Sequence, residues 1–509
     1  KSEGGDERLR SILVDKVAAR FESKCVFSLE SCGEIIPTHL NTDQKRAIEK
    51  VLQAQDFALI LGMPGTGKTT VIAELIKILA SAGKSILLTS YTHSAVDNIL
   101  LKLKDKNIKI ARLGMKHRIH PDTQVYRPCY ESLKTYEDYI KEIESTTVVA
   151  TTCLGIREIN SSLRSKDFDY VILDEASQIS MPVALAPLRF GEKFVMVGDH
   201  YQLPPLVKNE AARIGGLEES LFKILCEDHP ESVSELTIQY RMCEDIATLS
   251  NFLIYDGKLK CGTADVRDRG LDVPHLSRLA KFQTSPTIQR WIEDVLDFQR
   301  KVVFLNYDSC SDIQEKSSSD SITNPGELTI VQQCIDGMLE CGVEAKNVGV
   351  MTLYRAQLRL LKEKLQDERH EDLEILTADQ FQGRDKDCIV ISLVRSNLEQ
   401  KSGSLLKELR RVNVAMTRAK SKLMLIGSRK TISSVPEIEK FIALLQDRGW
   451  IYELSANFLQ AYVFPSTSKV QASCDKKLSG NTKPKVKSID ANSKILRNKP
   501  ITRQAVSEL

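Results

Sequence analysis

Residues 57–81 read F-A-L-I-L-G-M-P-G-T-G-K-T-T-V-I-A-E-L-I-K-I-L-A-S, and the rest of the chain is understood most easily from this stretch. Phe57–Leu61 is a short apolar run of the kind that forms a buried strand. From Thr70 to Ser81 apolar residues return at helical spacing, which predicts a helix, and Gly83 is placed to end it. Between the two, Gly62–Thr69 matches the G-x-x-x-x-G-K-[ST] pattern of a phosphate-binding loop.

The chemistry of such a loop explains its residue types. Glycines let the backbone curl until several N–H groups face one anion at the N-terminus of a helix. Lys68 is expected to reach the β- and γ-phosphates, and the Thr69 hydroxyl to complete the shell of a Mg²⁺ ion. The alternative is an ordinary glycine-rich turn, but a chance match has odds on the order of a few per cent. The expected nucleotide-binding residues of the loop are Gly62, Met63, Pro64, Gly65, Thr66, Gly67, Lys68, Thr69 and Thr70.

Composition sets wide limits on the remainder. A chain of 509 residues corresponds to roughly three domains. The net charge of +3 does not by itself indicate a nucleic-acid partner. It does not exclude a local basic groove, because acidic residues elsewhere would cancel the groove's charge in the sum. No apolar run approaches the ~18 residues of a membrane span. The twelve cysteines are scattered, which favours free thiols in a reducing compartment. The charged start K-S-E-G-G-D-E-R-L-R is not a signal peptide, so we expect a piece of a longer chain.

Strand-like and helix-like segments alternate from Leu40 onward, which predicts parallel sheets covered by helices. A polar stretch at about 257–300 separates two such series, so the fold class is α/β with two domains in tandem. Expected strands are 57–61, 86–89, 148–151, 170–173 and 194–197, then 302–305, 348–351, 389–393 and 423–426, with a helix at 355–365. The expected divisions are a preceding domain or linker without clear elements (1–37), a first domain (38–235), a second domain (236–463) with an irregular insertion (257–300), and a disordered basic tail (464–509).

A nucleotide site also needs carboxylates. Asp174 and Glu175 follow an apolar run in Y-V-I-L-D-E-A-S. The first is expected to bind Mg²⁺ and the second to act on the attacking water. An acidic pair after a strand is common. Taken alone, this pair is equally well explained by a structural role that has no part in the chemistry. With the phosphate loop about a hundred residues upstream, it becomes a second nucleotide motif.

Three further motifs narrow the kind of ATPase. Gln202, in G-D-H-Y-Q-L-P-P, is a neutral amide suited to sensing a γ-phosphate. Arg241, in Q-Y-R-M, and Arg418, in V-N-V-A-M-T-R-A-K, are candidate guanidinium groups for the negative charge of phosphoryl transfer. Each arginine by itself is more often a salt-bridge partner. Lys68, Asp174, Glu175, Gln202, Arg241 and Arg418 are therefore the expected catalytic set.

The ordered series of motifs resembles superfamily 1 helicases of the Upf-like branch over residues 38–430. The carrying segments are L-N-T-D-Q-K-R-A (40–47), T-S-Y-T-H-S-A-V-D-N (89–98), A-T-T-C (150–153), Y-R-A-Q (354–357) and D-Q-F-Q-G-R-D (379–385), besides those above. The resemblance implies two RecA-like P-loop NTPase domains that enclose ATP. It also implies adenine recognition by Gln44 and Tyr240, a ribose near Gly383, arginine fingers at Arg241 and Arg418, and strand contacts by Ser90, Thr92, His93, Thr152 and Arg355.

Within that branch the sequences of the motifs, such as G-M-P-G-T-G-K-T-T (62–70) and D-E-A-S-Q-I-S-M-P (174–182), are similar to those of the eukaryotic DNA replication ATP-dependent helicase/nuclease family. RNA helicases of the branch carry proline where Met63 stands. The resemblance implies ATP, Mg²⁺ and single-stranded DNA as ligands. It also implies 5′ to 3′ movement, a nuclear (and also mitochondrial) location, and roles in Okazaki-fragment flap processing and end resection with the single-strand-binding protein RPA. The family's nuclease and iron–sulfur cluster are expected only upstream of this chain.

Two alternatives stay open at this point. The first is an RNA helicase of the same branch, because the chemistry of ATP is identical and only the sugar of the strand differs. The second is a scaffold that clamps nucleic acid without moving along it. The intact set of expected catalytic residues argues against the scaffold.

Overall fold

The computed structural model describes residues 2–22, 36–104, 107–128, 135–156, 167–318, 321–381, 383–401 and 403–465. The chain divides into a first unit, Lys1–Phe464, and the residues that follow it. All that follows concerns the first unit, since the expected basic tail lies almost wholly outside the described residues.

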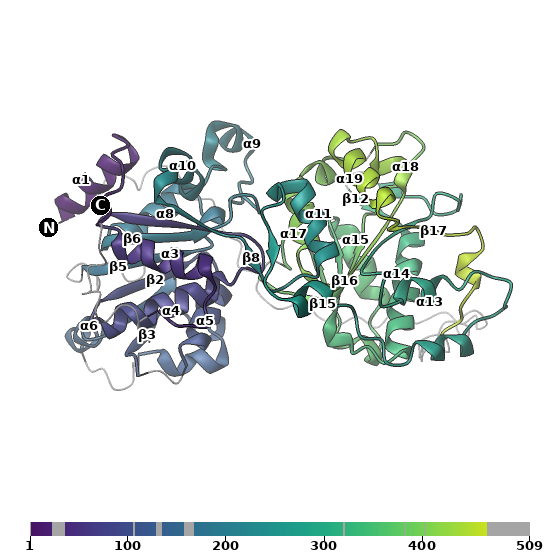
Figure 1. Cartoon of the computed structure of the whole chain (residues 1–509), viewed down its shortest axis with the longest axis horizontal. Coiled ribbons are helices and arrows are strands. Elements are labelled where there is room, and N and C mark those ends of the chain that lie inside the picture. The colour runs from purple at the N-terminus through teal and green to yellow at the C-terminus, as the bar shows by residue number, and fades with distance from the viewer. Residues whose placement is uncertain are drawn as a thin grey trace, which may run out of the picture. The chain divides into compact units, whose positions relative to one another are not determined.

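A seven-stranded parallel sheet has the strand order β3-β4-β2-β5-β6-β1-β7 (Figure 1). Its inner strands are apolar along their length because helices cover both faces. The five strands expected in this region are confirmed. The strands are β1 Phe57–Gly62, β2 Ile86–Ser90, β3 Ile110–Arg112, β4 Val148–Thr152, β5 Phe168–Asp174, β6 Gly191–Gly198 and β7 Val233–Leu236.

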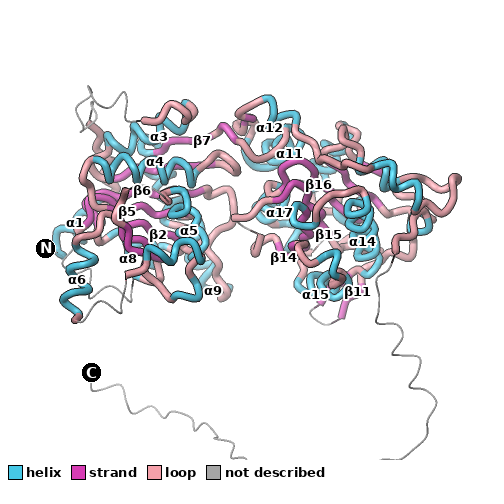
Figure 2. The backbone as a smooth tube through the Cα atoms, turned by 90° about the horizontal axis from the view of Figure 1, so that it is seen from below, coloured by secondary structure: helices cyan, strands magenta, loops and turns pink. Residues whose placement is uncertain are grey.

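Alternate residues of each strand point to opposite faces, and each face packs on its own helices. Ile60 and Ile172 pack with α3, α4 and α5, whereas Leu59 and Val171 pack with α8 and α10. Figure 2 shows the strands as a layer between these helices. Their bounds are α3 Thr42–Gln53, α4 Lys68–Ser81, α5 His93–Lys102, α6 Tyr136–Glu144, α8 Met181–Leu188, α9 Glu210–Ala212 and α10 Leu221–Asp228.

The register of the sheet fixes which residues share its carboxyl edge. Ser90, the last residue of β2, is the cross-strand partner of Asp174 on one side and of Thr152 on the other. Because all three strands run in the same direction, their ends meet at one edge. The edge beside the phosphate loop therefore carries two hydroxyls and a carboxylate.

A six-stranded parallel sheet follows, with the order β14-β13-β15-β16-β10-β17. The expected strands and the helix at 355–365 are confirmed. The strands are β10 Val302–Asn306, β13 Val348–Thr352, β14 Glu374–Thr377, β15 Lys386–Ser392, β16 Ala419–Gly427 and β17 Ile451–Glu453. Two short pairs stand apart, β8 Ile238–Gln239 with β9 Lys260–Cys261, and β11 Lys316–Ser318 with β12 Ser321–Thr323.

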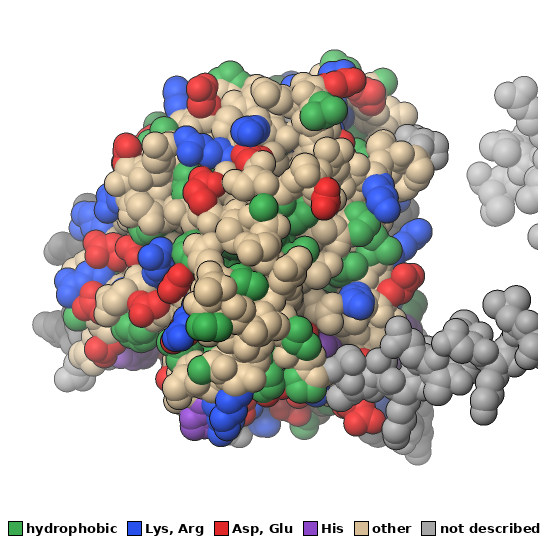
Figure 3. All heavy atoms as spheres, turned by 90° about the vertical axis from the view of Figure 1, so that its right-hand side faces the viewer, with side chains coloured by type: hydrophobic (Ala, Val, Ile, Leu, Met, Phe, Trp, Pro, Cys, Tyr) green, Lys and Arg blue, Asp and Glu red, His purple; other side chains and the backbone are tan. Residues whose placement is uncertain are grey.

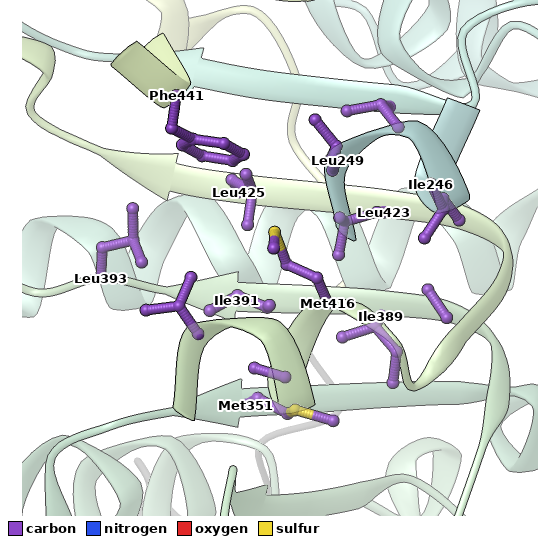
Figure 4. Close-up of a cluster of buried hydrophobic side chains, with 14 of the residues drawn as sticks. Ile246, Leu249, Met351, Ile389, Ile391, Leu393, Met416, Leu423, Leu425 and Phe441 are labelled. Atoms are coloured by element: carbon purple, nitrogen blue, oxygen red, sulfur yellow. The ribbon is translucent and has the colours of Figure 1, made fainter. Parts of the chain in front are cut away.

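Both faces of this sheet are also covered. On one face, Ile389, Ile391 and Leu425 pack under α11, α17 and α19 (Figure 4). On the other, Val350 and Val390 pack against α14 and α15. The helices are α11 Glu244–Ser250, α12 Ala264–Asp268, α13 Trp291–Leu296, α14 Pro325–Glu340, α15 Arg355–Lys364, α16 Ser404–Lys407, α17 Leu409–Met416, α18 Arg429–Ile432 and α19 Pro436–Asp447.

The polar stretch 257–300 contains short elements that pack on the second sheet. Trp291 is fully buried, and its indole N–H donates to the Phe458 carbonyl at 3.1 Å. Leu279 and Leu296 join the same core cluster. The segment is thus attached to the second sheet by a few large side chains.

The N-terminal residues differ from the expectation of no clear element. Helix α1 spans Ser2–Leu13, and its Leu9 and Ile12 side chains are buried in the core of the first sheet. Arg8 donates to the Gly191 carbonyl at 2.8 Å. The helix was missed because so few apolar residues reveal its periodicity.

Charged side chains of both signs lie on the one face that Figure 3 shows, where lysines and arginines are interspersed with aspartates and glutamates. Among the described residues, no helix is both long enough and apolar enough to cross a bilayer.

Candidate functional site

The phosphate loop joins β1 to α4 and is shaped by its glycines. Gly65 and Gly67 have positive φ angles of 73° and 82°, which side-chain-bearing residues rarely adopt. A Cβ on Gly65 would lie 2.6 Å from the Arg241 Cβ. The Lys68 ammonium donates to the Gly62 carbonyl at 2.8 Å. The loop is therefore a curled backbone at a helix N-terminus, closely approached by Arg241 from the Q-Y-R-M segment.

The acidic pair lies at the end of β5. Asp174 is buried, whereas Glu175 is half-buried and has a φ of 51°, a strained conformation of the kind found at functional sites. Gln178, one turn further on, donates to the Glu175 carboxylate at 2.7 Å. Burial, and then the Glu175 carboxylate, raise the pKa of Asp174 above its ordinary value, while the Lys68 ammonium opposes the rise.

These groups fit a magnesium ion. Mg²⁺ takes oxygen ligands and is held in proteins by one or two carboxylates together with phosphate oxygens. The Thr69 hydroxyl and the Asp174 carboxylate supply such oxygens at one cavity. A cation beside Asp174 would also favour its ionised form, which burial otherwise disfavours.

Arg418 reaches the first sheet's residues through Gln202. Its buried guanidinium donates to Gln202 Oε1 at 3.0 Å and to the Val414 carbonyl at 2.9 Å. Burial, and then the cationic Arg241, lower the pKa of Arg418 to about 9, which still leaves it protonated at neutral pH.

Arg241 is held by different partners. It donates to Asp385 at 3.2 Å and to the Thr417 carbonyl at 3.3 Å. Lys420 forms an ion pair with the same Asp385 at 2.7 Å. Burial opposes ionisation of Asp385, but Arg241 and Lys420 hold its pKa below the ordinary value.

One cavity of about 940 Å³ gathers most of the expected residues. It is bounded by the phosphate loop, the acidic pair and both arginines. The expected residues that line it are Pro64, Gly65, Thr66, Gly67, Lys68, Thr69, Thr70, Thr92, Asp174, Glu175, Gln202, Tyr240, Arg241, Gly383 and Arg418. The expected residues that do not line it are Gln44, Gly62, Met63, Ser90, His93, Thr152 and Arg355.

The two residues expected to recognise adenine lie next to the loop. Gln44 is buried, and its amide donates to the Thr66 carbonyl at 3.0 Å and accepts from the Asn41 N–H at 3.1 Å. Each polar atom of Gln44 thus makes one hydrogen bond, to the loop or to the start of α3, and one N–H and one oxygen lone pair of the amide remain. The Tyr240 ring is 38% exposed, and its hydroxyl accepts from the Asn41 side chain at 3.0 Å.

Similarity to known proteins was found over nearly the whole chain. Two family descriptions, each of an AAA domain, match residues 39–131 with 125–210 and residues 217–430. The DNA replication ATP-dependent helicase/nuclease of Saccharomyces cerevisiae is 59% identical over 100% of this chain and 33% of its own length. The human protein of the same name is 41% identical over 82% of this chain and 39% of its own length. The chain belongs to this helicase/nuclease family.

The chain spans 30% to 43% of the length of these relatives. Of the Arabidopsis thaliana protein, for example, it covers 33% at 41% identity. It corresponds to the helicase part of these proteins. Among solved structures, the Arterivirus nonstructural protein 10 helicase matches 77% of this chain and 63% of its own with 15% identity and a TM-score of 0.39.

Four of the five residues expected to contact a nucleic-acid strand lie at or just after the carboxyl ends of β2 and β4, and the fifth, Arg355, lies at the start of α15. Ser90 and Thr152 are buried; the Thr152 hydroxyl accepts from the Gly155 N–H at 3.1 Å. The Thr92 hydroxyl caps α5, and His93 lies 3.1 Å from Arg112. Arg355 is exposed at the start of α15. Their role as strand contacts stays a prediction.

Several lining residues were not singled out from the sequence. Gln178 follows Glu175 by one turn, and only its position in the motif could have drawn attention to it. Asp385 lies within D-Q-F-Q-G-R-D and Lys420 within T-R-A-K, both quoted as motifs but without a role. Lys102 reaches the cavity from α5.

Proposed function

We propose that this chain hydrolyses ATP and uses the energy to move along single-stranded DNA and to separate duplex strands. The observation that carries the proposal is the cavity itself. It is lined by the phosphate loop and acidic pair that follow β1 and β5, and by Arg241 and Arg418 that border the second sheet. A site with this composition suits phosphoryl transfer, where positioning and charge stabilisation supply most of the catalysis.

Each residue has a distinct part in this mechanism. The backbone N–H groups of the loop and the Lys68 ammonium bind the phosphates. Thr69 and Asp174 would hold a Mg²⁺ ion, which would supply positive charge to neutralise the phosphates. Glu175, oriented by Gln178, accepts a proton from the attacking water. Arg418 and Arg241 stabilise the negative charge that develops on the γ-phosphoryl group.

Movement would follow because residues beside both sheets form the site, the phosphate loop and acidic pair beside the first sheet and the two arginines beside the second. Contacts between the phosphates and the arginines favour a closed cavity, and hydrolysis weakens them. Alternation of the two states would shift one strand-binding surface past the other, with Ser90, Thr92, His93 and Thr152 on one side and Arg355 on the other. Because such a grip is electrostatic and independent of sequence, DNA affinity should fall steeply with salt.

We further propose the domain limits 38–235 and 236–463, with adenine held by Gln44 and Tyr240 and the ribose near Gly383. For the longer protein we propose 5′ to 3′ movement, flap processing and end resection with RPA, and a nuclear and mitochondrial location. Its nuclease and iron–sulfur cluster belong to residues outside this chain. The curated relatives bear the name DNA replication ATP-dependent helicase/nuclease. This name supports DNA rather than RNA as the strand.

The test is steady-state ATP hydrolysis by the purified chain with single-stranded DNA or RNA of one sequence. DNA should stimulate hydrolysis, and Lys68→Ala should abolish it and duplex unwinding while DNA binding persists. Lys77→Ala is the matched control, since Lys77 lies on the same helix but pairs with Glu74 at 2.7 Å.

Three results would contradict the proposal in different ways. Equal or greater stimulation by RNA would favour the RNA helicase. Binding to DNA without hydrolysis would favour a scaffold. Normal turnover by Lys68→Ala would refute the assignment of the phosphate loop.

A further inference from the structure

A buried tyrosine connects the second-sheet side of the cavity to the first. Tyr255 ends the helical turn η6 (Asn251–Tyr255), which packs on α11 and α17. Its hydroxyl donates to Asp199 Oδ2 at 2.8 Å and accepts from the Asn413 amide at 3.1 Å. Asp199 directly follows β6, in the G-D-H-Y-Q-L-P-P motif.

Asp199 in turn orients the amide of Gln202. Gln202 Nε2 donates to Asp199 Oδ2 at 2.6 Å, which leaves Gln202 Oε1 to accept from Arg418 at 3.0 Å. A flipped amide would face the carboxylate with an oxygen and the guanidinium with an NH₂ group, so only one orientation satisfies both neighbours. The orientation of Gln202 is therefore set by Asp199.

The contacts form a chain of hydrogen bonds that the backbone between its two ends closes into a ring. Asn413 lies on α17 and Arg418 shortly after its end, so both ends of the chain Asn413–Tyr255–Asp199–Gln202–Arg418 attach to the same segment. Every member is less than 7% exposed. In such surroundings polar groups are costly to leave unpaired, and a network of this kind favours one arrangement of its parts; within it only Asn413 Oδ1 has no hydrogen-bond partner among the described residues.

The chemistry of Tyr255 makes it a fixed element of this ring. Burial, and then the Asp199 charge, raise the pKa of Tyr255 well above its ordinary value, so it remains a neutral phenol. A neutral phenol has one O–H group, and here that group is committed to Asp199. An apolar side chain would fill the same space but could not orient the carboxylate.

We propose that Tyr255 is a positioning residue for ATP hydrolysis, which acts through Asp199 and Gln202 to hold the Arg418 guanidinium at the cavity. The inference rests on the proposed ATPase function and deepens it. Tyr255 touches neither the cavity nor a reacting group. Tyr255 joins Asp199, in the G-D-H-Y-Q-L-P-P motif after β6, to Asn413 on α17. Through this connection it helps to fix the position of Arg418.

The test compares Tyr255→Phe with Tyr307→Phe. Tyr307 is also fully buried; it donates to a carboxylate, Glu327, at 2.7 Å and accepts from an asparagine, Asn324, at 3.2 Å. Its network lies wholly around the second sheet. The two substitutions thus remove the same kind of bond and should lower the unfolding temperature similarly.

Only Tyr255→Phe should slow catalysis. We expect kcat for DNA-stimulated ATP hydrolysis to fall about 10-fold, the worth of one buried hydrogen bond, with the KM for ATP and the affinity for DNA within about twofold of the parent chain. Asp199→Asn should give a similar loss. Because both residues act through one ring, the double variant should be little slower than either single variant.

Two outcomes overturn the proposal: a kcat for Tyr255→Phe no lower than for Tyr307→Phe, or losses that multiply in the double variant. If Tyr255→Phe does not fold, the kcat of Asp199→Asn is compared with that of Tyr307→Phe instead, and the same outcome decides the proposal. If the parent chain shows no DNA-stimulated hydrolysis, the proposed function itself fails, and that result is seen before any variant is made.

Discussion

Replacing Arg418 with alanine tests whether the guanidinium takes part in catalysis or only in packing. In the structure its contact across the cavity is a hydrogen bond to Gln202 at 3.0 Å. A hydrogen bond to a charged group is worth about 1.5–3 kcal/mol, or roughly a 10- to 150-fold change in rate if it is lost entirely in the transition state. An arginine that stabilises the transferring phosphoryl group is worth about 10³–10⁵ in kcat.

These magnitudes separate the two explanations. We expect Arg418→Ala to bind ATP nearly as well as the parent chain but to hydrolyse it about 10³-fold or more slowly, since Lys68 and the loop remain to hold the phosphates. The measurement is single-turnover hydrolysis with saturating single-stranded DNA, alongside equilibrium binding of a fluorescent ATP analogue. Gln202→Ala removes the same hydrogen bond and leaves the guanidinium, so it should lose much less.

A control for arginine removal in general is Arg267→Ala, because Arg267 is half-exposed and pairs with the adjacent Asp268. An Arg418→Ala rate within about 100-fold of the parent, and equal to that of Gln202→Ala, would mean that Arg418 acts only through its contact with Gln202. An unchanged kcat would show that it is purely structural.

Two further predictions concern stability. Arg112→Ala should lower the free energy of unfolding by about 3–5 kcal/mol in urea titrations, because the buried Asp97 loses its partner at 2.8 Å; Lys109→Ala, from an exposed pair, should cost less than about 1 kcal/mol, and equal costs would contradict the reasoning. Burial raises the pKa of Glu327 to about 7, so the folded chain holds this proton more tightly than the unfolded chain. The stability that this one group contributes is therefore fully present below about pH 4.5 and is lost as pH rises through 7. Glu327→Gln should therefore gain stability relative to the parent between pH 5 and pH 8, and a difference that does not change with pH would refute this.

The sequence was most informative where function depends on contiguous residues. The parallel strands were predicted because each is apolar throughout, and the residues after them define the carboxyl edge of each sheet. The loop, Asp174 and Glu175 each follow such a strand directly, and the structure brings them to one cavity with Arg241 and Arg418.

What the sequence did not reveal depends on tertiary packing. Tyr255 and Asp199 are 56 residues apart, and nothing local marks their contact. The contact of the Gln44 amide with the Thr66 carbonyl also depends on how α3 meets the loop, and the expected adenine contact of Gln44 stays a prediction. Helix α1 and Trp291 were missed because a few large apolar residues can anchor a segment without a visible period.

The pairing of Ser90 with both Asp174 and Thr152 bears on how the motor could convert chemistry into motion. On the proposed roles of these residues, the position assigned to the DNA strand and the carboxylate assigned to the metal ion are one interstrand spacing of about 4.8 Å apart. Backbone hydrogen bonds hold the spacing between neighbouring strands almost constant. If these residues have the proposed roles, the first sheet itself connects the metal site to the strand contacts.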